Sequence, residues 1–147
     1  MTAYVVDASV AAKWFLEEPF TAEAAALLRS GNRLSAPDFL LLEMDSLLVK
    51  RMRRGDLTAE KAREVRSVLG QLPLDYHAFG AFQDHAWELA CQTGCSIYDC
   101  LYLAMALALG APLVTADRKF LGSLARGPLA GHVLWVEDAA LQTEDQP

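Results

Sequence analysis

Four carboxylates are the side chains of this 147-residue chain with the clearest potential for chemistry: Asp7, Glu43, Asp99 and Asp117. Carboxylates supply hard oxygen ligands of the kind that Mg²⁺ and Mn²⁺ prefer. Such an ion can activate a water molecule, polarise a phosphoryl oxygen and neutralise the charge of a leaving group, and hydrolysis of a phosphodiester needs all three. The four acids are therefore a candidate metal site.

Two of the acids follow apolar segments that read as buried strands. Asp7 comes directly after residues 4–6, and Asp117 comes two residues after residues 113–115. Because sites in open α/β sheets form beyond the carboxyl ends of the strands, both carboxylates are expected at the same edge of the sheet. Each could instead be a helix N-cap that accepts backbone hydrogen bonds, so neither is decisive alone.

The other two acids lie on predicted helices. Asp99 forms a capping box with Ser96 at the start of a helix, residues 97–109, that is apolar on every face and is therefore expected to be buried. A carboxylate there needs a partner, which a cap or a metal ion could each supply. Glu43 lies at the border of the apolar stripe of another helix, and a solvated glutamate is the alternative for it.

Other catalytic patterns are missing from the sequence. His77, His85 and His132 are isolated, without an HExxH or His–Asp motif. The chain contains no glycine-rich phosphate loop and no Gly-x-Ser-x-Gly elbow. Metal-assisted chemistry at the carboxylates is therefore the main hypothesis.

Strands that alternate with helices predict an α/β fold of three layers around a central, mainly parallel sheet. Strands are expected at residues 4–6, 34–36, 72–75, 113–115 and 132–136. Helices are expected at residues 8–16, 22–29, 37–54, 59–69, 79–93, 97–109 and 117–124. The sequence predicts a single domain at residues 1–141 and a flexible C-terminal tail at residues 142–147.

The net charge of −6 argues against a simple electrostatic nucleic-acid binder, but the four acids alone account for −4 of it. Positive charge is concentrated at residues 50–66, which hold 7 of the 13 lysines and arginines. This segment reads either as a solvated helical hairpin with salt-bridged faces or as a surface that contacts backbone phosphates. Its candidate contact residues are Lys50, Arg51, Arg53 and Arg54.

No membrane association is expected. The longest apolar run, residues 100–114, is interrupted by Gly110 and Pro112 and is shorter than the roughly 20 apolar residues of a membrane span. The N-terminus does not read as a signal peptide, and three cysteines give no disulfide framework. These features favour a cytoplasmic protein.

Four short segments carry a resemblance to a known family. They are Val-Asp-Ala-Ser at residues 6–9, Pro-Asp-Phe-Leu-Leu-Leu-Glu at 37–43, Ser-Ile-Tyr-Asp-Cys-Leu-Tyr-Leu-Ala at 96–104, and Leu-Val-Thr-Ala-Asp-Arg-Lys-Phe at 113–120. In this order and spacing they resemble the motifs of PIN-domain nucleases, in particular the VapC toxins of bacterial toxin–antitoxin pairs. Each motif is weak singly, and the four together extend over nearly the whole chain.

The resemblance implies a PIN-like fold and endonucleolytic cleavage of RNA by metal-activated water, with Mg²⁺ as cofactor and Mn²⁺ as a plausible substitute. Asp7, Asp99 and Asp117 would hold the metal, and Glu43 would complete the catalytic site. The resemblance also implies a homodimer and a small antitoxin that covers the site. The expected products are 5′-phosphate and 3′-hydroxyl ends, from a folded RNA with an exposed single-stranded loop.

Three further residues match supporting positions of the family. Ser9 and Thr115 would act as hydroxyl donors to the carboxylates. Ser46 stands where many members have asparagine, and its hydroxyl reaches less far than an amide. Two alternative functions are a non-catalytic interaction module that uses Trp14 and Phe15, and a structure-specific DNA nuclease on the same fold.

Overall fold

The computed structural model describes residues 2–29 and 31–145, and within them the chain forms a five-stranded sheet. The strands lie in the order β3-β2-β1-β4-β5, and every neighbouring pair is parallel. This order reverses between β1 and β4, and parallel sheets bind ligands at such a switch point, beyond the carboxyl ends of the strands. The strands are β1 (Ala3–Val6), β2 (Arg33–Pro37), β3 (Leu74–His77), β4 (Leu113–Thr115) and β5 (Val133–Trp135).

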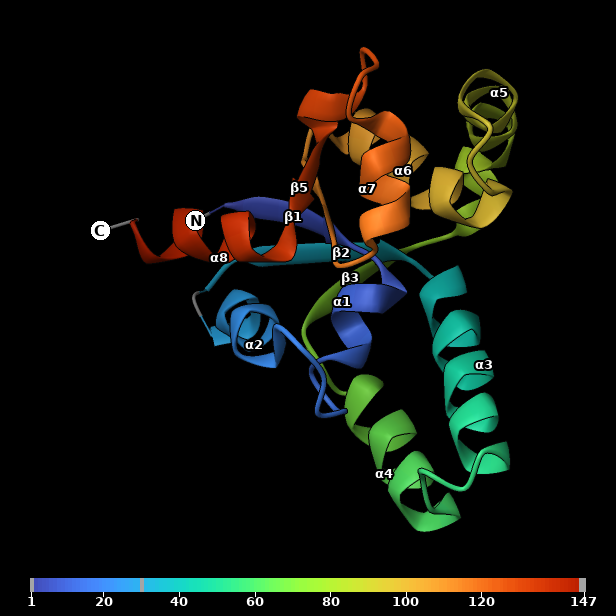
Figure 1. Ribbon diagram of the computed structural model, residues 1–147, viewed down its shortest axis with the longest axis vertical. Helices are drawn as coiled ribbons and strands as arrows, with labels where there is room; N and C mark the ends of the chain where they lie inside the picture. The colour runs from blue at the N-terminus through green and yellow to red at the C-terminus, as the bar shows by residue number, and fades with distance from the viewer. Residues whose placement is uncertain (1, 30, 146–147) are drawn as a thin grey trace.

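Helices cover both faces of the sheet and give the three-layer α/β/α architecture that the sequence predicts (Figure 1). The lower layer in this view holds α1 (Ala8–Ala12), α2 (Thr21–Arg29), α3 (Phe39–Arg53) and α4 (Ala59–Leu69). The upper layer holds α5 (Gln83–Thr93), α6 (Ile97–Leu109) and α7 (Arg118–Leu124). Helix α8 (Val136–Glu144) packs against α2 and β5, and two short 3₁₀ segments are η1 (Phe79–Phe82) and η2 (Ala130–His132).

Helix α6 is the buried centre of the upper layer, as its uniformly apolar sequence predicts. It packs on β1, β2 and β4, and residues 100–106 are all buried. The Ser96 hydroxyl caps it by accepting a hydrogen bond of 3.1 Å from the backbone N–H of Asp99. The cap and the surrounding core together fix the first turn of α6, and Asp99 with it.

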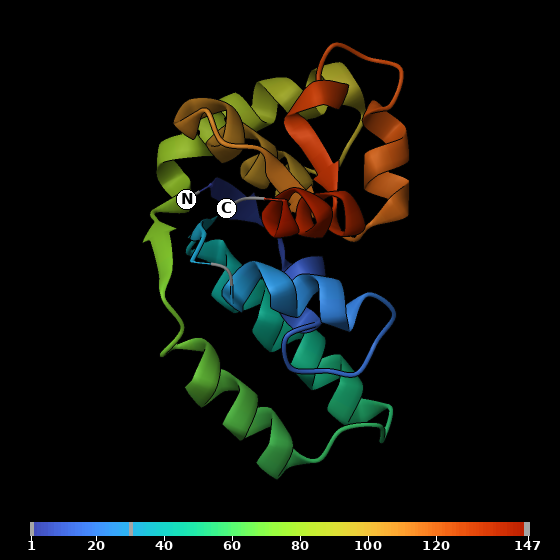
Figure 2. The same ribbon diagram turned by 90° about the vertical axis from the view of Figure 1, so that its left-hand side faces the viewer.

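Helices α3 and α4 form a hairpin that projects from the sheet, away from the upper layer (Figure 2). The turn between them uses Gly55, whose φ of +81° is open to glycine at little cost. Helix α4 buries Ala62, Val65 and Leu69 and exposes most of its other residues. The hairpin is therefore amphipathic and much more exposed than the layers around the sheet.

The helix expected at residues 8–16 ends at Ala12 instead. The backbone N–H groups of Lys13, Trp14 and Phe15 bond carbonyls three residues earlier, which is tighter winding than that of an α-helix. The Trp14 indole N–H donates to the Ala24 carbonyl at 2.8 Å and holds this turn against α2. A tertiary contact therefore overrides the helical pattern.

Two other boundaries differ from expectation. The strand expected at residues 72–75 is Leu74–His77, because Pro73 has no N–H to donate and β2 pairs with the residues after it. The helix expected at residues 79–93 begins with the 3₁₀ segment η1. Neither change alters the order of the sheet.

The C-terminal prediction was wrong in part. The sequence predicts a flexible tail from Gln142, but α8 continues to Glu144 and buries Val136, Ala139, Ala140 and Thr143. These positions have the 3.6-residue spacing of an amphipathic helix, a signal that the interpretation missed. Residues 146–147 of the predicted tail lie outside the described residues.

Within residues 2–29 and 31–145, every helix is too short or too polar to cross a membrane.

Candidate active site

Asp7 is a buried carboxylate that three hydrogen bonds hold at the junction of β1 and α1. Its Oδ1 accepts from the backbone N–H of Val10 (3.1 Å) and from the Ser9 hydroxyl (2.5 Å). Its Oδ2 accepts from the Thr115 hydroxyl (2.5 Å). Asp7 is 6% exposed, and it caps α1 while its side chain stays at the carboxyl end of β1.

Ser9 and Thr115 also connect Asp7 to the end of β4. The Ser9 oxygen accepts from the backbone N–H of Ala116 (2.9 Å), and the Thr115 oxygen accepts from that of Asp117 (3.1 Å). Asp117 in turn caps α7, where its Oδ1 accepts from the N–H of Phe120 (3.1 Å). The capping alternative therefore holds for both aspartates, and capping also fixes their side chains at one edge of the sheet.

Asp99 is the common neighbour of the other three acids. Burial raises the pKa of Asp7 to about 6, and the charge of Asp99 adds to this rise. Burial also raises the pKa of Glu43, again with a contribution from Asp99. The pKa of Asp99 is raised by burial and by the charge of Asp117. The fold thus brings all four acids within electrostatic range of one another.

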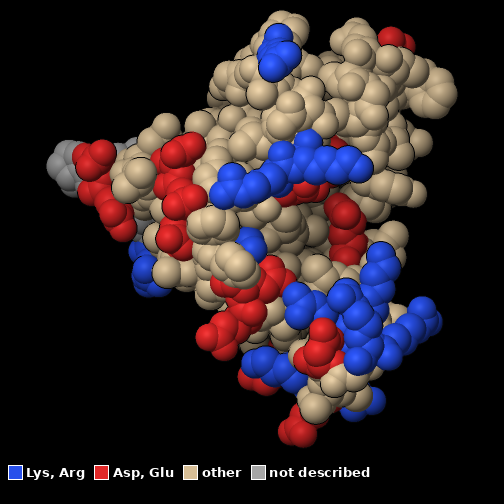
Figure 3. Space-filling view, viewed as in Figure 1, with Lys and Arg blue, Asp and Glu red and all other residues tan. Residues whose placement is uncertain are grey.

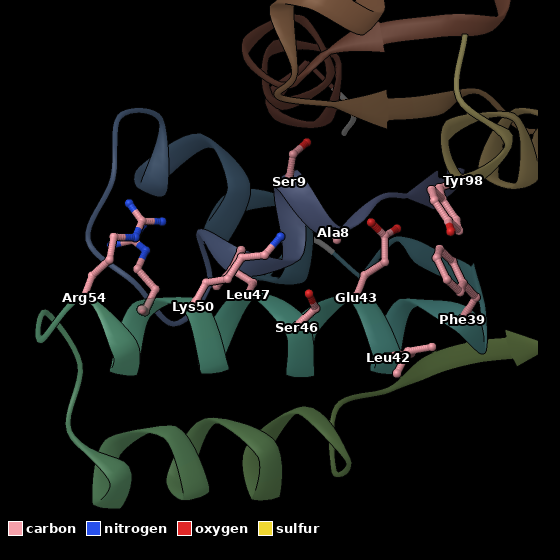
Figure 4. Close-up of a pocket in the computed structure, with 11 residues that line it drawn as sticks. Ala8, Ser9, Phe39, Leu42, Glu43, Ser46, Leu47, Lys50, Arg54 and Tyr98 are labelled. Carbon is pink, nitrogen blue, oxygen red and sulfur yellow. The ribbon is translucent and has the colours of Figure 1, made fainter.

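A pocket of about 660 Å³ opens beside these acids (Figure 4). Of the four carboxylates, Glu43 lines it directly and is turned toward Ala8. Ser46 lies along the same face of α3 and is exposed. The pocket is lined by Ala8, Ser9, Phe39, Leu42, Glu43, Ser46, Leu47, Lys50, Arg51, Arg54 and Tyr98.

The four basic residues proposed from the sequence are not equivalent. Lys50 and Arg54 are exposed and line the pocket, whereas Arg53 is exposed but is not among the lining residues. Arg51 is committed to ion pairs with Glu18 (2.6 Å) and Asp56 (3.8 Å).

The rest of the hairpin follows the same division. Arg66 of α4 pairs with Asp45 of α3 at 2.7 Å. Both interpretations of the basic segment therefore hold in part, since some of its charges form salt bridges and others face the pocket. Figure 3 shows basic side chains over the far end of the hairpin and over the start of α7, with acidic side chains between them.

Tyr102 is the residue of this site that the sequence reasoning missed. It is 1% exposed, and its hydroxyl has no hydrogen-bond partner among the described residues. Burial raises its pKa above the usual range, and the charges of Glu43, Asp7 and Asp99 add to this effect. The available signal was its position three residues after Asp99, which places both on the same side of α6.

The residues fit a divalent cation in their chemistry, although the metal site is not ready-made. Carboxylate oxygens are the donors that Mg²⁺ uses, and a cation would relieve the mutual repulsion that raises the pKa values. The buried, unpartnered Tyr102 hydroxyl also marks this place as polar. In the part of the chain that the structure describes, no three acidic, histidine or cysteine side chains are already grouped closely enough to hold an ion.

The surface needed for a non-catalytic interaction module is used within the molecule. Trp14 and Phe15 are half-buried and pack against the core, and the indole of Trp14 is bonded to Ala24. The apolar face of the first helices is therefore occupied by the protein itself. The acidic edge of the sheet remains the strongest candidate site.

Comparison with known proteins agrees with this geometry. Residues 4–122 match the family model of the PIN domain. The chain belongs to the PIN-domain family. Ribonuclease VapC3 of Pyrobaculum aerophilum is 30% identical over 117 residues, which cover 78% of this chain and 89% of the relative. The chain is thus a PIN-domain protein of the VapC type.

Solved structures share the fold of this PIN domain. The crystal structure of PAE2754 from Pyrobaculum aerophilum matches with a TM-score of 0.74 and 23% identity, over 99% of this chain and 91% of that one. VapC20 of Mycobacterium tuberculosis, described as a toxin that cleaves the sarcin-ricin loop, matches with a TM-score of 0.65 and 17% identity, over 82% and 94%. VapBC2 of Rickettsia felis, bound to a promoter DNA fragment, gives 0.61 and 17%, over 91% and 98%.

Proposed function

We propose that this chain is a Mg²⁺- or Mn²⁺-dependent endoribonuclease that acts as the toxin of a toxin–antitoxin pair. The observation that carries the proposal is the convergence of Asp7, Glu43, Asp99 and Asp117 at the switch point of a PIN-domain sheet, with Asp99 the neighbour of the other three. The similarity to a VapC ribonuclease supports RNA as the substrate.

In this proposal Asp7, Asp99 and Asp117 would hold the ion, and Glu43 would complete the catalytic set. A bound Mg²⁺ or Mn²⁺ would supply an activated water and a polarised phosphoryl oxygen for hydrolysis of the phosphodiester. Ser9 and Thr115 orient Asp7 through the hydrogen bonds described above, and so limit the reorganisation needed when the ion binds.

The RNA would enter along the face of α3 that forms the pocket. Lys50 and Arg54 stand at one end of this face and supply positive charge for backbone phosphates, whereas Glu43 stands toward the other end (Figure 4). Tyr98, which is 55% exposed, lies beside Glu43 in the same pocket. We expect Arg51 to contribute less, because its ion pair with Glu18 already engages it.

The proposed protein partners are a second copy of this chain and a small antitoxin. Similar folds occur in the VapBC2 complex of Rickettsia felis and in a toxin–antitoxin complex from Klebsiella pneumoniae. Leu42 and Phe79 are exposed beside the pocket, and exposed apolar side chains that cluster in this way are typical of surfaces covered by protein. Co-expression with the protein encoded beside this chain should suppress toxicity.

The decisive test is cleavage of RNA and DNA in parallel, in Mg²⁺, Mn²⁺ or EDTA, with analysis of the product ends. We expect RNA to be cut only with a divalent ion and to yield 5′-phosphate and 3′-hydroxyl ends. A 2′,3′-cyclic phosphate would contradict water as the nucleophile. Preferential cutting of branched DNA would favour the nuclease with a different substrate.

A further inference from the structure

The Tyr102 hydroxyl is an unusual feature of the buried interior. Buried polar atoms nearly always have a hydrogen-bond partner, because a buried hydroxyl that lacks one costs about 1–3 kcal/mol. Among the described residues only two buried side-chain polar atoms lack a partner, the hydroxyls of Tyr76 and Tyr102. Tyr102 is the more enclosed of the two, at 1% exposed, and it lies on the rigid helix α6.

The surroundings of this hydroxyl are acidic. It lies close enough to Glu43, Asp7 and Asp99 for each to interact with it electrostatically, and Glu43 is the strongest of these neighbours. Asp7 has both carboxylate oxygens engaged by Ser9, Val10 and Thr115. Glu43, by contrast, reaches the site from the exposed helix α3, so its carboxylate is the natural acceptor for the hydroxyl.

We propose that Tyr102 is a positioning residue whose hydroxyl donates a hydrogen bond to the Glu43 carboxylate and holds it in the orientation in which it joins a divalent cation. The inference rests on the proposed function, since it concerns the same acidic site. A neutral tyrosine can only donate to a carboxylate, and a hydrogen bond to a charged group is stronger than one between neutral groups. Tyr102 would thereby extend to Glu43 the support that Ser9 and Thr115 give to Asp7.

Replacement of each unpartnered tyrosine by phenylalanine tests this inference, because Tyr76 provides a matched control on β3. We would measure the melting temperature in EDTA and the binding of Mn²⁺, followed by the loss of the free-ion signal in electron paramagnetic resonance. Tyr102→Phe and Tyr76→Phe should both keep or raise the melting temperature in EDTA, since each removes a hydroxyl without a partner. Tyr102→Phe should weaken Mn²⁺ binding about tenfold, and Tyr76→Phe should leave it unchanged.

A double-mutant cycle identifies the partner of the hydroxyl. If Tyr102 acts through Glu43, Tyr102→Phe should have little further effect on Mn²⁺ affinity in a Glu43→Gln background. Equal Mn²⁺ affinity of the wild type and Tyr102→Phe would overturn the inference, and so would full additivity in the cycle. A marked loss of stability for Tyr102→Phe in EDTA would overturn the premise that the hydroxyl lacks a partner.

The same experiment separates this inference from the proposed function. Wild-type protein that binds Mn²⁺ and cuts RNA, together with an unchanged Tyr102→Phe variant, contradicts only the role of Tyr102. Wild-type protein that neither binds Mn²⁺ nor cuts RNA contradicts the proposed function, and the role of Tyr102 with it.

Discussion

The candidate site has two unlike halves. On the sheet side, Asp7 is buried and bonded to Ser9, Val10 and Thr115, so its position is fixed by the ends of β1 and β4. On the hairpin side, Glu43 stands on an exposed helix in a pocket with flexible basic neighbours. The comparison suggests a division of work, in which the sheet fixes the metal ligands and α3 adapts to the substrate. We define these halves as the fixed half and the adaptable half.

Removal of charge in the fixed half should give the largest effect. Asp7→Asn keeps the shape and one acceptor oxygen, but should lower RNA cleavage by about 10³-fold or more, because a metal ligand is lost. In the absence of divalent ions the same variant should be more stable at neutral pH. The raised pKa of Asp7, about 6, makes its ionised form cost the folded state roughly 3 kcal/mol.

Cleavage assays and denaturant unfolding in EDTA check both expectations. Asp138→Asn, an exposed aspartate on α8, is the matched control and should change neither quantity. Full cleavage by Asp7→Asn would remove the basis of the proposed function.

The hydroxyl that supports Asp7 should matter next. Thr115→Val removes the donor to Asp7 Oδ2 and the acceptor for the N–H of Asp117, and should reduce cleavage about 10- to 100-fold. Thr143→Val is the control, because Thr143 is also buried and bonded, through Asn32, but lies on α8. Similar losses of cleavage in the two variants would point to a general loss of stability instead.

The pH dependence tests the fixed half without mutation. Asp7 must be ionised to hold a cation, so Mn²⁺ affinity should fall by up to tenfold per pH unit below about 6. Stability in EDTA should have the opposite trend. Because the folded-state pKa of Asp7 lies above the unfolded value of 3.8, its contribution to stability is complete below about pH 4 and is lost as pH rises through 6. A flat Mn²⁺ affinity between pH 5 and 7 would contradict the role of Asp7.

Substitutions in the adaptable half should have the smallest effects on cleavage chemistry and act mainly on binding. Lys50→Ala combined with Arg54→Ala should weaken RNA binding about three- to tenfold and reduce its salt dependence by roughly one unit of slope. Arg53→Ala serves as control, since Arg53 does not line the pocket. Equal effects of Arg53→Ala, measured by fluorescence anisotropy across a salt series, would assign the binding to the overall charge of the hairpin.

Much of the fold was predictable because local signals agreed with the final structure. The uniformly apolar helix behind Asp99 is the buried α6, and Ser96 caps it. Gly55 marks the end of the helix that carries Glu43. The first helix was too long in the prediction because the contact of Trp14 with Ala24 belongs to the tertiary structure. Helix α8 was missed although its spacing was visible.

The site was predictable in its parts and not in its arrangement. Residue type and the succession of strand and acid made Asp7 and Asp117 candidates at one edge, and the motifs added Asp99 and Glu43. Periodicity could not distinguish Lys50 and Arg54 from Arg51, because the ion pair of Arg51 is formed with Glu18 on a loop 33 residues earlier. It also could not show which buried tyrosine lacks a partner.

The sequence by itself determined which residues are acids, where helices begin, and that the strands are buried and parallel, since capping and hydropathy are local properties. Only the tertiary structure decided that the ends of β1 and β4 share the hydroxyls of Ser9 and Thr115, and that Asp99 lies between the fixed and adaptable halves. The reason is physical. Burial and mutual charge depend on neighbours that are distant in sequence, and these neighbours give the four acids their raised pKa values or fixed positions.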